Sequence, residues 1–258
     1  MKKLTVFCAA ACLAASAAAQ NHPDLHEVLD RQKGRNLIEI PKGTYTLDVR
    51  SNGPYKFHNL TDVHINGNGS TVICNNQEQA FSFYNCVRVE LRDLTIDYDP
   101  LCFTQGEITA VAEDGSWFDV RIDEGYPVTG LAANRVQFYD PQTRLLKRNS
   151  ITTYTSNYSA LKQLGHNLFR AVKNGTWSAG EQVGDLVVMD VKTDKPNAGV
   201  HTVMLNKCYN TKLENVTVYG SNTFSFFEKE GYANEYRNCV VDRGPMPQGI
   251  RPRLRSGN

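Results

Sequence analysis

Short runs of alternating apolar and polar residues, separated by turns rich in Asn, Asp and Gly, recur along much of the chain. Such runs predict β-strands, because successive side chains of a strand point to opposite faces. Four of these runs align with one another: FHNLTDVHINGNGSTVI from Phe57, FYNCVRVELRDLTIDY from Phe83, LNKCYNTKLENVTVYG from Leu205 and EYRNCVVDRG from Glu235. Self-similarity at a step of roughly 20 to 50 residues is typical of a stacked solenoid. The pattern therefore predicts an all-β solenoid built from short strands and tight turns.

The alignment produces columns of equivalent residues. One column holds Asn59, Asn85, Lys207 and Asn238, and the next holds Leu60, Cys86, Cys208 and Cys239. The asparagines suit turn positions, because their side chains bond to nearby backbone. The cysteines suit inward positions of successive coils, where a free thiol packs as a small hydrophobe. We expect stacked buried thiols there, with disulfides as the alternative.

The segment before the repeat predicts a cap. In NHPDLHEVLDRQK, Leu25, Val28 and Leu29 fall on one face of a helix. A short amphipathic helix of this kind would cover the open end of a parallel solenoid. NLIEIPKGTYTL, from Asn36, then predicts a strand, a Pro-Lys-Gly turn and a second strand.

A different pattern of apolar and polar residues interrupts the repeat after residues 97–100 and continues until about Gly199. GEITAVAEDGSWFDVRID alternates around Asp114-Gly115, which predicts a hairpin, and RVQFYDPQTRLLKR does the same around Asp140-Pro141. These strands predict a small antiparallel β-barrel or sandwich inserted into the solenoid. The predicted divisions are residues 1–19 (signal peptide), 20–100 (cap and first coils), 101–198 (inserted subdomain) and 199–258 (further coils, incomplete at the end).

The first residues have the features of a secretory signal. Lys2 and Lys3 precede an apolar run, and Ala17-Ala18-Ala19 offers a cleavage site for small residues. The apolar run is too short to span a membrane. We expect export by a bacterial-type signal to the periplasm or the medium, with a lipid anchor at Cys12 as the weaker alternative.

Charge and cysteine content narrow the function. With 28 Lys and Arg against 27 Asp and Glu, the chain shows no sign of a nucleic-acid or polybasic membrane partner. The seven cysteines fall to five when Cys8 and Cys12 leave with the signal, and an odd number cannot all pair. Their spacing matches no zinc site, and we expect neither a bound metal nor a cofactor.

Three motifs carry a resemblance to a known family: IPKGTYTL, LRDLTIDYDP and FTQGEITAV leading into the insertion. The chain resembles right-handed parallel β-helix proteins of the pectate-lyase-like superfamily, from Gln20 to Asn258. Within that superfamily it is similar to exported bacterial glycoside hydrolases of family 110, the α-1,3-galactosidases. The resemblance implies a right-handed β-helix that acts on a glycan or polysaccharide and cleaves a terminal α-galactosyl-type linkage.

The same resemblance bears on the end of the sequence. PRLRSGN resembles the lead-in to an acidic segment, after which the family's coils carry much of the catalytic face. The resemblance therefore implies an incomplete enzyme with weak or no activity. A complete form would be a monomer, and a truncated one would be prone to aggregation, because an unclosed coil exposes apolar surface and a strand edge.

Glycoside hydrolysis usually needs two carboxyl groups, about 5 Å apart for retention or about 6.5–9.5 Å for inversion. Asp97 and Asp99 in TIDYDP alternate along a predicted strand and would point the same way. Glu228 and Glu230 in SFFEKEG are expected on an outward face beside Phe227, where sugar rings can stack. Asp242 lies in the last predicted coil. Turn formation and a solvated strand face are the structural alternatives for these acids.

Other residues suggest alternative functions. Arg251 and Arg253, with Arg255, would suit an acidic sugar, as would be needed by a calcium-dependent polysaccharide lyase of the same fold. A lyase also wants a dense acidic cluster, which the sequence lacks. His166 and His201 have no partners at metal-ligand spacing. A non-catalytic β-helix that binds glycans or plays a structural part is the third possibility.

Overall fold

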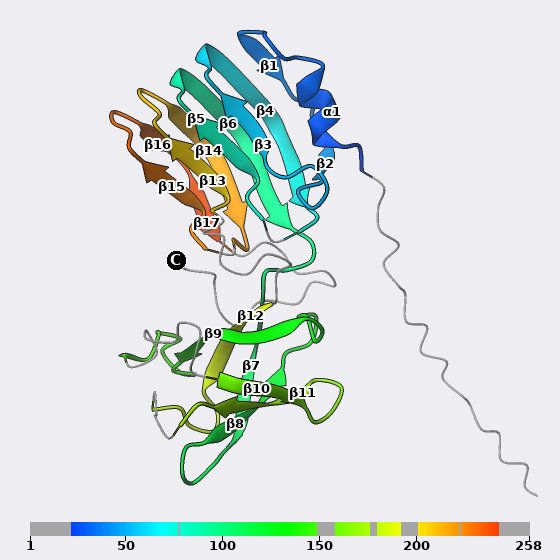
Figure 1. Ribbon diagram of the computed structural model, residues 1–258, viewed down its shortest axis with the longest axis vertical. Helices are drawn as coiled ribbons and strands as arrows, with labels where there is room; N and C mark the ends of the chain where they lie inside the picture. The colour runs from blue at the N-terminus through cyan, green and yellow to red at the C-terminus, as the bar shows by residue number, and fades with distance from the viewer. Residues whose placement is uncertain are drawn as a thin grey trace, which may run out of the picture.

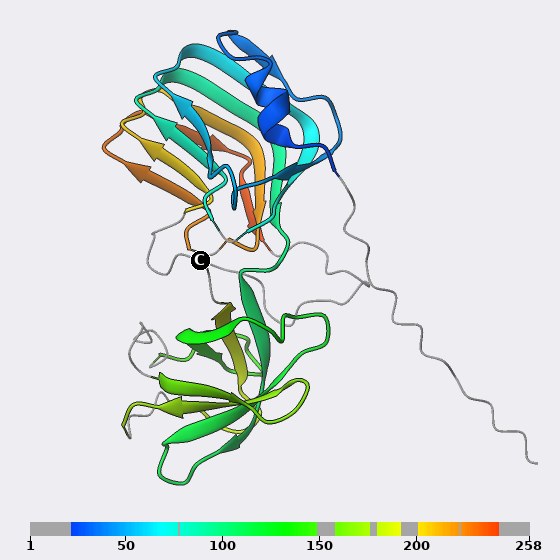
Figure 2. The same cartoon turned by 45° about the vertical axis from the view of Figure 1, so that its right-hand side comes forward.

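The computed structural model describes residues 22–76, 78–148, 158–175, 180–191, 201–221 and 223–242. Within these ranges the chain forms one short helix and two separate β structures (Figures 1 and 2). One is a stack of parallel strands, and the other is an antiparallel sheet with its own core. The predicted signal peptide, Arg251 and Arg253 lie outside the described residues.

The parallel strands form three faces, and successive coils visit the faces in the same order. The first face holds β1 (Leu37–Glu39), β16 (Glu235–Arg237) and the first halves of β4 (Thr61–Cys74), β6 (Val87–Tyr98) and β14 (Lys212–Tyr219). The second face holds β2 (Thr44–Leu47), the second halves of β4, β6 and β14, and β17 (Val240–Asp242). The third face holds β3 (Tyr55–His58), β5 (Phe81–Tyr84), β13 (Val203–Asn206) and β15 (Phe226–Lys229). This is the right-handed parallel β-helix that the sequence predicts.

Residues with positive φ mark two corners of each coil. Asn59, Asn85 and Lys207 have φ between 54° and 56° where the third face passes to the first. Asp93 and Asn215 have φ of 56° and 53° where the long strands bend between the first two faces. Asn and Asp tolerate this left-handed conformation better than other side chains, which explains their recurrence. Asn85 donates to the Oδ1 of Asn59 at 2.8 Å, so these corner side chains also join successive coils.

The fourth repeat lies in a different register from the one the sequence alignment predicts. Asn238 donates to the Oδ1 of Asn215 at 3.2 Å, so it belongs to the bend between the first and second faces. The residue equivalent to Lys207 is Glu230, with φ of 54°, because Lys207 N donates to the carbonyl of Lys229 in the next coil. Cys239 is therefore not stacked on Cys86 and Cys208, and it is only partly buried. The five described cysteines are free thiols.

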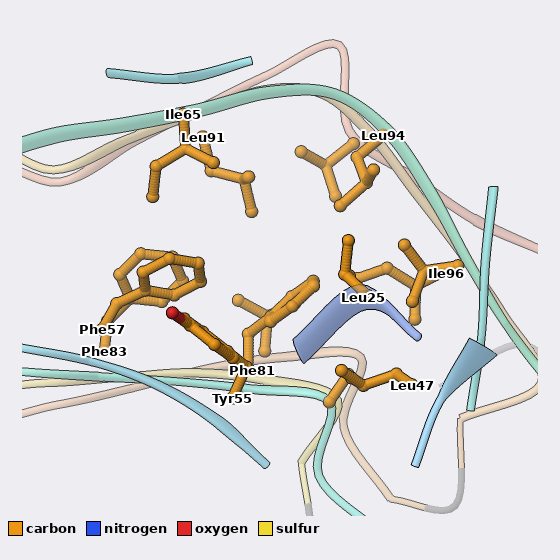
Figure 3. Packing of buried hydrophobic residues seen from close by; sticks show 14 of the residues in the cluster. Leu25, Leu47, Tyr55, Phe57, Ile65, Phe81, Phe83, Leu91, Leu94 and Ile96 are labelled. Carbon is orange, nitrogen blue, oxygen red and sulfur yellow. The ribbon is translucent and has the colours of Figure 1, made fainter. Parts of the chain in front are cut away.

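Columns of apolar side chains fill the interior of the β-helix (Figure 3). Phe57 and Phe83 stack with ring centroids 4.8 Å apart, on the inner side of the third face. Ile65 and Leu91 are in register on the first face, and both are 1% exposed. Identical positions in successive coils thus carry similar side chains, and dispersion contacts and apolar burial hold the stack together.

The predicted cap is present at the start of the coils. Helix α1 (Leu25–Asp30) buries Leu25 and Leu29 against the interior column. Asp24 accepts a hydrogen bond from the backbone N–H of His26, which satisfies one of the unpaired donors at the helix start. The helix covers the end of the stack where β1 and β2 begin (Figure 1).

The inserted strands lie between β6 and β13, which puts the insertion between the second and third faces of one coil. Six strands pair antiparallel in the order β10-β11-β8-β7-β12-β9. Their bounds are β7 (Phe103–Val111), β8 (Trp117–Ile122), β9 (Leu131–Tyr139), β10 (Tyr158–Gln163), β11 (Leu168–Lys173) and β12 (Leu186–Val191). The hairpin predicted at Asp114-Gly115 joins β7 to β8, with Gly115 at φ of 71°. No described helix is long and apolar enough to cross a membrane.

Candidate functional site

Polar groups from three coils meet where the second face passes to the third and the chain leaves for the insertion. The hydroxyl of Tyr98, at the end of β6, donates to the carbonyl of Glu78 and lies 2.9 Å from the hydroxyl of Thr202. Thr202 in turn contacts the hydroxyl of Ser221 at 3.0 Å. This buried chain of hydroxyls fixes the residues around it, since each polar group has a partner.

An aromatic cluster of His201, Phe224 and Phe227 lies at this corner. The rings of His201 and Phe227 are stacked, with centroids 4.0 Å apart and planes at 22°. The rings of Phe224 and Phe227 are also nearly parallel, with planes at 14° and centroids 5.9 Å apart. Phe224 keeps 53% of its surface exposed. The three rings therefore present flat apolar surface to solvent, which is the usual surface for stacking a sugar ring.

His201 has close neighbours that its surroundings in the sequence did not indicate. Its Nδ1 lies 2.9 Å from the Thr223 hydroxyl, and its ring contacts both phenylalanines. Burial lowers the pKa of His201 from its ordinary value of 6.5, because desolvation disfavours the charged imidazolium. At neutral pH the ring is therefore a neutral member of the aromatic cluster.

Two of the predicted acids share one outward column on the second face. Asp97 is in register with Ile73 of β4, and Tyr219 is in register with Asp242 of β17. Because Val218 pairs with Ile96, the next residue along, Tyr219, follows beside Asp97. Asp97 and Asp242 are thus separated by two strand spacings, about 9–10 Å at the backbone. Both carboxylates are half-buried.

Asp99 lies just beyond β6, exposed and in the segment that leads to the insertion. Its backbone N–H donates to the carbonyl of Cys74 at 3.0 Å. Strand alternation therefore does not extend from Asp97 to Asp99.

The position predicted for Glu228 is wrong. Glu228 is in register with Leu205, and through it with Phe83, so its side chain shares the inward column of the third face. It accepts hydrogen bonds from Asn234 at 2.8 Å and from the Tyr236 hydroxyl at 3.4 Å. The physical reason is the phase of the strand. Phe226 aligns with the buried Val203, and Glu228, two residues on, must point the same way.

Glu230 and Phe227 do face outward. Phe227 belongs to the aromatic cluster, whereas Glu230 sits in the following turn with 52% of its side chain exposed. Glu230 lies 3.3 Å from Lys229 and 3.8 Å from Lys207. The structure therefore places Asp97 and Asp242 in one outward column of the second face and Phe227 on the outside of the third face. Glu228 and Glu230 lie outside that column of acids.

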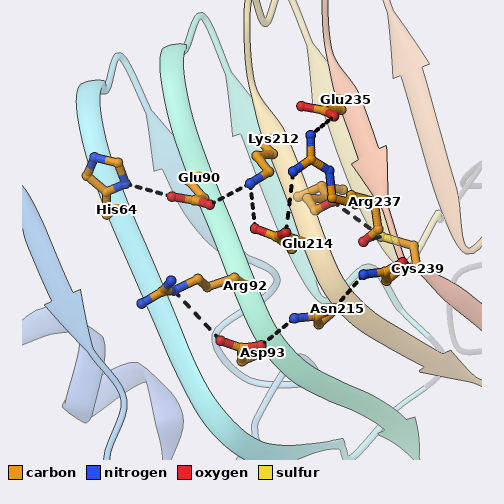
Figure 4. A network of polar contacts seen from close by, with 12 residues as sticks. His64, Glu90, Arg92, Asp93, Lys212, Glu214, Asn215, Glu235, Arg237 and Cys239 are labelled. Carbon is orange, nitrogen blue, oxygen red and sulfur yellow. Dashed lines mark hydrogen bonds and ion pairs between the residues drawn. The ribbon is translucent and has the colours of Figure 1, made fainter.

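A separate polar network covers the outside of the first face (Figure 4). Lys212 contacts Glu90 at 3.2 Å and Glu214 at 2.5 Å, and His64 contacts Glu90 at 2.8 Å. Arg237 lies 3.8 Å from Glu214. These charges pair across successive coils, so the network stabilises the stack and neutralises its own carboxylates. The described residues contain no group of three or more His, Cys, Asp or Glu side chains arranged to hold a metal ion.

Phe224 and Tyr219 were not among the residues predicted from the sequence, although Phe224 belongs to the aromatic cluster and Tyr219 lies beside Asp97. Their signal is the run YGSNTFSFF, in which aromatic residues flank a polar turn. Comparison with protein-family models and with curated proteins finds no match for the chain. The similarity to α-galactosidases therefore depends on the sequence motifs alone.

Proposed function

We propose that the chain is a carbohydrate-active β-helix protein that binds a saccharide at the corner between the second and third faces. The observation that carries this proposal is the stacked aromatic cluster, with its exposed Phe224, at the corner where Tyr98 at the end of β6 contacts Thr202. Apolar sugar faces stack on such rings, while sugar hydroxyls bond to nearby carboxylates. The exported location suggested by the signal-like first residues suits a glycan substrate.

The reaction we propose is hydrolysis of a terminal α-galactosyl-type linkage. Asp97 and Asp242, about 9–10 Å apart at the backbone, come close to the spacing of about 6.5–9.5 Å between carboxyl groups in inverting hydrolases. One carboxylic acid donates its proton to the leaving oxygen. The other carboxylate takes a proton from the water that attacks the anomeric carbon from the opposite side. The choice of a galactosyl substrate follows from the sequence resemblance.

An assay of the full chain with an aryl α-galactoside and α-galactosyl oligosaccharides tests this reaction. We expect weak hydrolysis at most, and Asp97→Asn and Asp242→Asn should each lower it further, by about 100-fold or more. Asp99→Asn is the matched control, because that exposed acid lies outside the outward column. Inversion would appear as the β-anomer of galactose in a fresh NMR spectrum.

Three results would contradict the proposed reaction. Hydrolysis that survives both substitutions would remove Asp97 and Asp242 from the mechanism. Products that absorb in the ultraviolet would indicate a lyase instead. Saccharide binding with no turnover would leave the binding proposal standing and remove the hydrolase.

A further inference from the structure

The outer surface of the third face has an unusual charge distribution. Its outward positions form two columns across β3, β5, β13 and β15, because all four strands are parallel and in register. The first column holds Lys56, Ser82, Met204 and Phe227, and the second holds His58, Tyr84, Asn206 and Lys229. None of these eight residues is acidic. Glu228 of β15 belongs to the inward column instead, although it is exposed in the last described coil.

One lysine and one histidine lie against the exposed tyrosine on this surface, and burial lowers the pKa of His58 from its ordinary value of 6.5, so that ring is neutral at neutral pH. Lys207 follows β13, and its Nζ lies 5.9 Å from the centre of the Tyr84 ring. The ring of His58 packs edge-on to Tyr84 at 5.6 Å, and its Nε2 lies 3.3 Å from the Ser82 hydroxyl. Tyr84 keeps 37% of its surface exposed. We call Lys56, His58, Tyr84, Lys207 and Lys229 the basic strip.

Glu230 borders the basic strip. Glu230 lies 3.3 Å from Lys229 and 3.8 Å from Lys207, and all three side chains are 44–56% exposed. Ion pairs this exposed and this long contribute little, since water screens them and the side chains lose freedom on pairing. An anionic group on a ligand can therefore replace Glu230 as the partner of both lysines.

The basic strip is continuous with the aromatic cluster. Phe227 and Lys229 are outward residues of the same strand, two positions apart, and Phe227 stacks on His201. A saccharide whose ring lies on the aromatic cluster would extend toward Lys229 and Lys207. The charge on these lysines complements an anion and gives a neutral sugar no equivalent partner.

We propose that the basic strip binds an anionic group, a carboxylate or a sulfate ester, carried by the saccharide that the aromatic cluster stacks. This inference deepens the proposed function and rests on it for the position of the sugar ring. It assigns the substrate to the acidic saccharides. Lys207 and Lys229 hold the anion, and Tyr84 lies beneath the sugar that bears it.

Binding titrations of the full chain with three polysaccharides test the proposal. The probes are a neutral galactan, a carboxylated polygalacturonate and a sulfated galactan. We expect one or both anionic polymers to bind more tightly than the neutral one, with affinity that falls as salt rises. The double variant Lys207→Gln/Lys229→Gln should lose at least about tenfold in that affinity. The control Lys33→Gln/Lys42→Gln removes the same charge elsewhere and should bind as the wild type does.

The outcomes separate this inference from the proposed function. Equal binding of neutral and anionic polymers, with no effect of the lysine variant, overturns anion binding by the basic strip. It leaves sugar stacking by the aromatic cluster standing. Binding of an anionic polymer that depends on Lys207 and Lys229 but survives Phe224→Ala supports anion binding by the basic strip. It contradicts the proposed position of the sugar ring on the aromatic cluster. An equal loss in the control variant means attraction to net charge only and overturns the inference, as does failure of all three polymers to bind. Preference for one anionic polymer identifies the group as carboxylate or sulfate.

Discussion

Glu228 occupies the position in its coil that Leu205 occupies in the coil before, on the inward side of the third face. Leu205 is 1% exposed and continues the column of Phe57 and Phe83. An exposed carboxylate thus follows three buried apolar side chains in one inward column, and it accepts hydrogen bonds from Asn234 and Tyr236.

This position predicts that Glu228 takes no part in catalysis. We expect Glu228→Gln to leave saccharide hydrolysis and binding unchanged, because the amide keeps the hydrogen-bonding shape while the outward surface is untouched. Rates measured beside those of Asp97→Asn check this. A loss comparable to that of Asp97→Asn would mean that the Glu228 carboxylate reaches the substrate.

Gly67 predicts where the bend of the long strands is most sensitive. A methyl group on Gly67 would meet the backbone oxygen of Asp93 in the next coil and the Cδ1 of Leu94 at 2.8 Å. Since backbone cannot move aside cheaply, Gly67→Ala should lower the free energy of unfolding by about 1–3 kcal/mol. Gly43→Ala is the matched control, because its added methyl makes only ordinary contacts of 3.5 Å or more. Urea denaturation of both variants measures the difference, and equal stabilities would contradict the close packing of these coils.

A buried ion pair in the inserted sheet gives a third prediction. The side chains of Lys173 and Glu181 are 0% and 1% exposed, and burial lowers the pKa of Lys173 to about 8. Glu181→Leu alone would leave the ammonium group without this partner and should cost about 3–5 kcal/mol. The double variant Lys173→Met/Glu181→Leu should recover most of that loss, because both charges are replaced by apolar groups. Thermal unfolding compares them, and a double variant no more stable than Glu181→Leu would contradict the account.

Acid should weaken the first face through Glu90. Burial alone would raise the pKa of Glu90, but hydrogen bonds from His64 and Lys212 outweigh it, so the pKa is lowered from its ordinary value of 4.5. The folded state therefore binds the proton less readily than the unfolded state does. The resulting stability is present above pH 4.5 and is lost as the pH falls through the lowered value.

Unfolding of Glu90→Gln beside the wild type tests this linkage. Between about pH 6 and about pH 3, the wild type should lose more stability than the variant does. Equal slopes would show that Glu90 titrates alike in the folded and unfolded chains. His64→Gln, which removes one of the two partners, should fall between them.

The fold could be predicted from the sequence because its strong signals are local. The pair Asp114-Gly115 is a strong hairpin signal by itself. Leu25 and Leu29 are four residues apart, so they share one apolar face as soon as the segment is helical. The corner asparagines hold a conformation that few side chains accept, which made the repeat visible.

The same chemistry also explains the error in register. Each coil has two corners of positive φ, and both favour Asn, so Asn238 and Asn85 look equivalent in sequence although they turn different corners. Glu230, which does occupy the corner equivalent to Asn85, has no asparagine to mark it.

The site was harder to predict because it depends on phase and on contacts between coils. In SFFEKEG two adjacent phenylalanines allow either phase of the strand, and only the pairing of Phe226 with Val203 turns Glu228 inward. His201 and Phe227 stack although a full coil of the β-helix separates them along the chain, so no local sequence pattern predicts the contact. Asp97 could be proposed from the sequence because it lies near the end of a strong strand signal.

The most direct test of the account is a titration of the full chain with the saccharide that binds best among the galactans and acidic polymers named above. We expect binding by the wild type, a loss of at least about tenfold with Phe224→Ala, and unchanged stability, because Phe224 is 53% exposed. Leu145→Ala, which removes an apolar side chain that is 68% exposed in the inserted sheet, should bind as the wild type does. Failure of the wild type to bind any of these saccharides, or equal binding by Phe224→Ala, would contradict the proposed saccharide site.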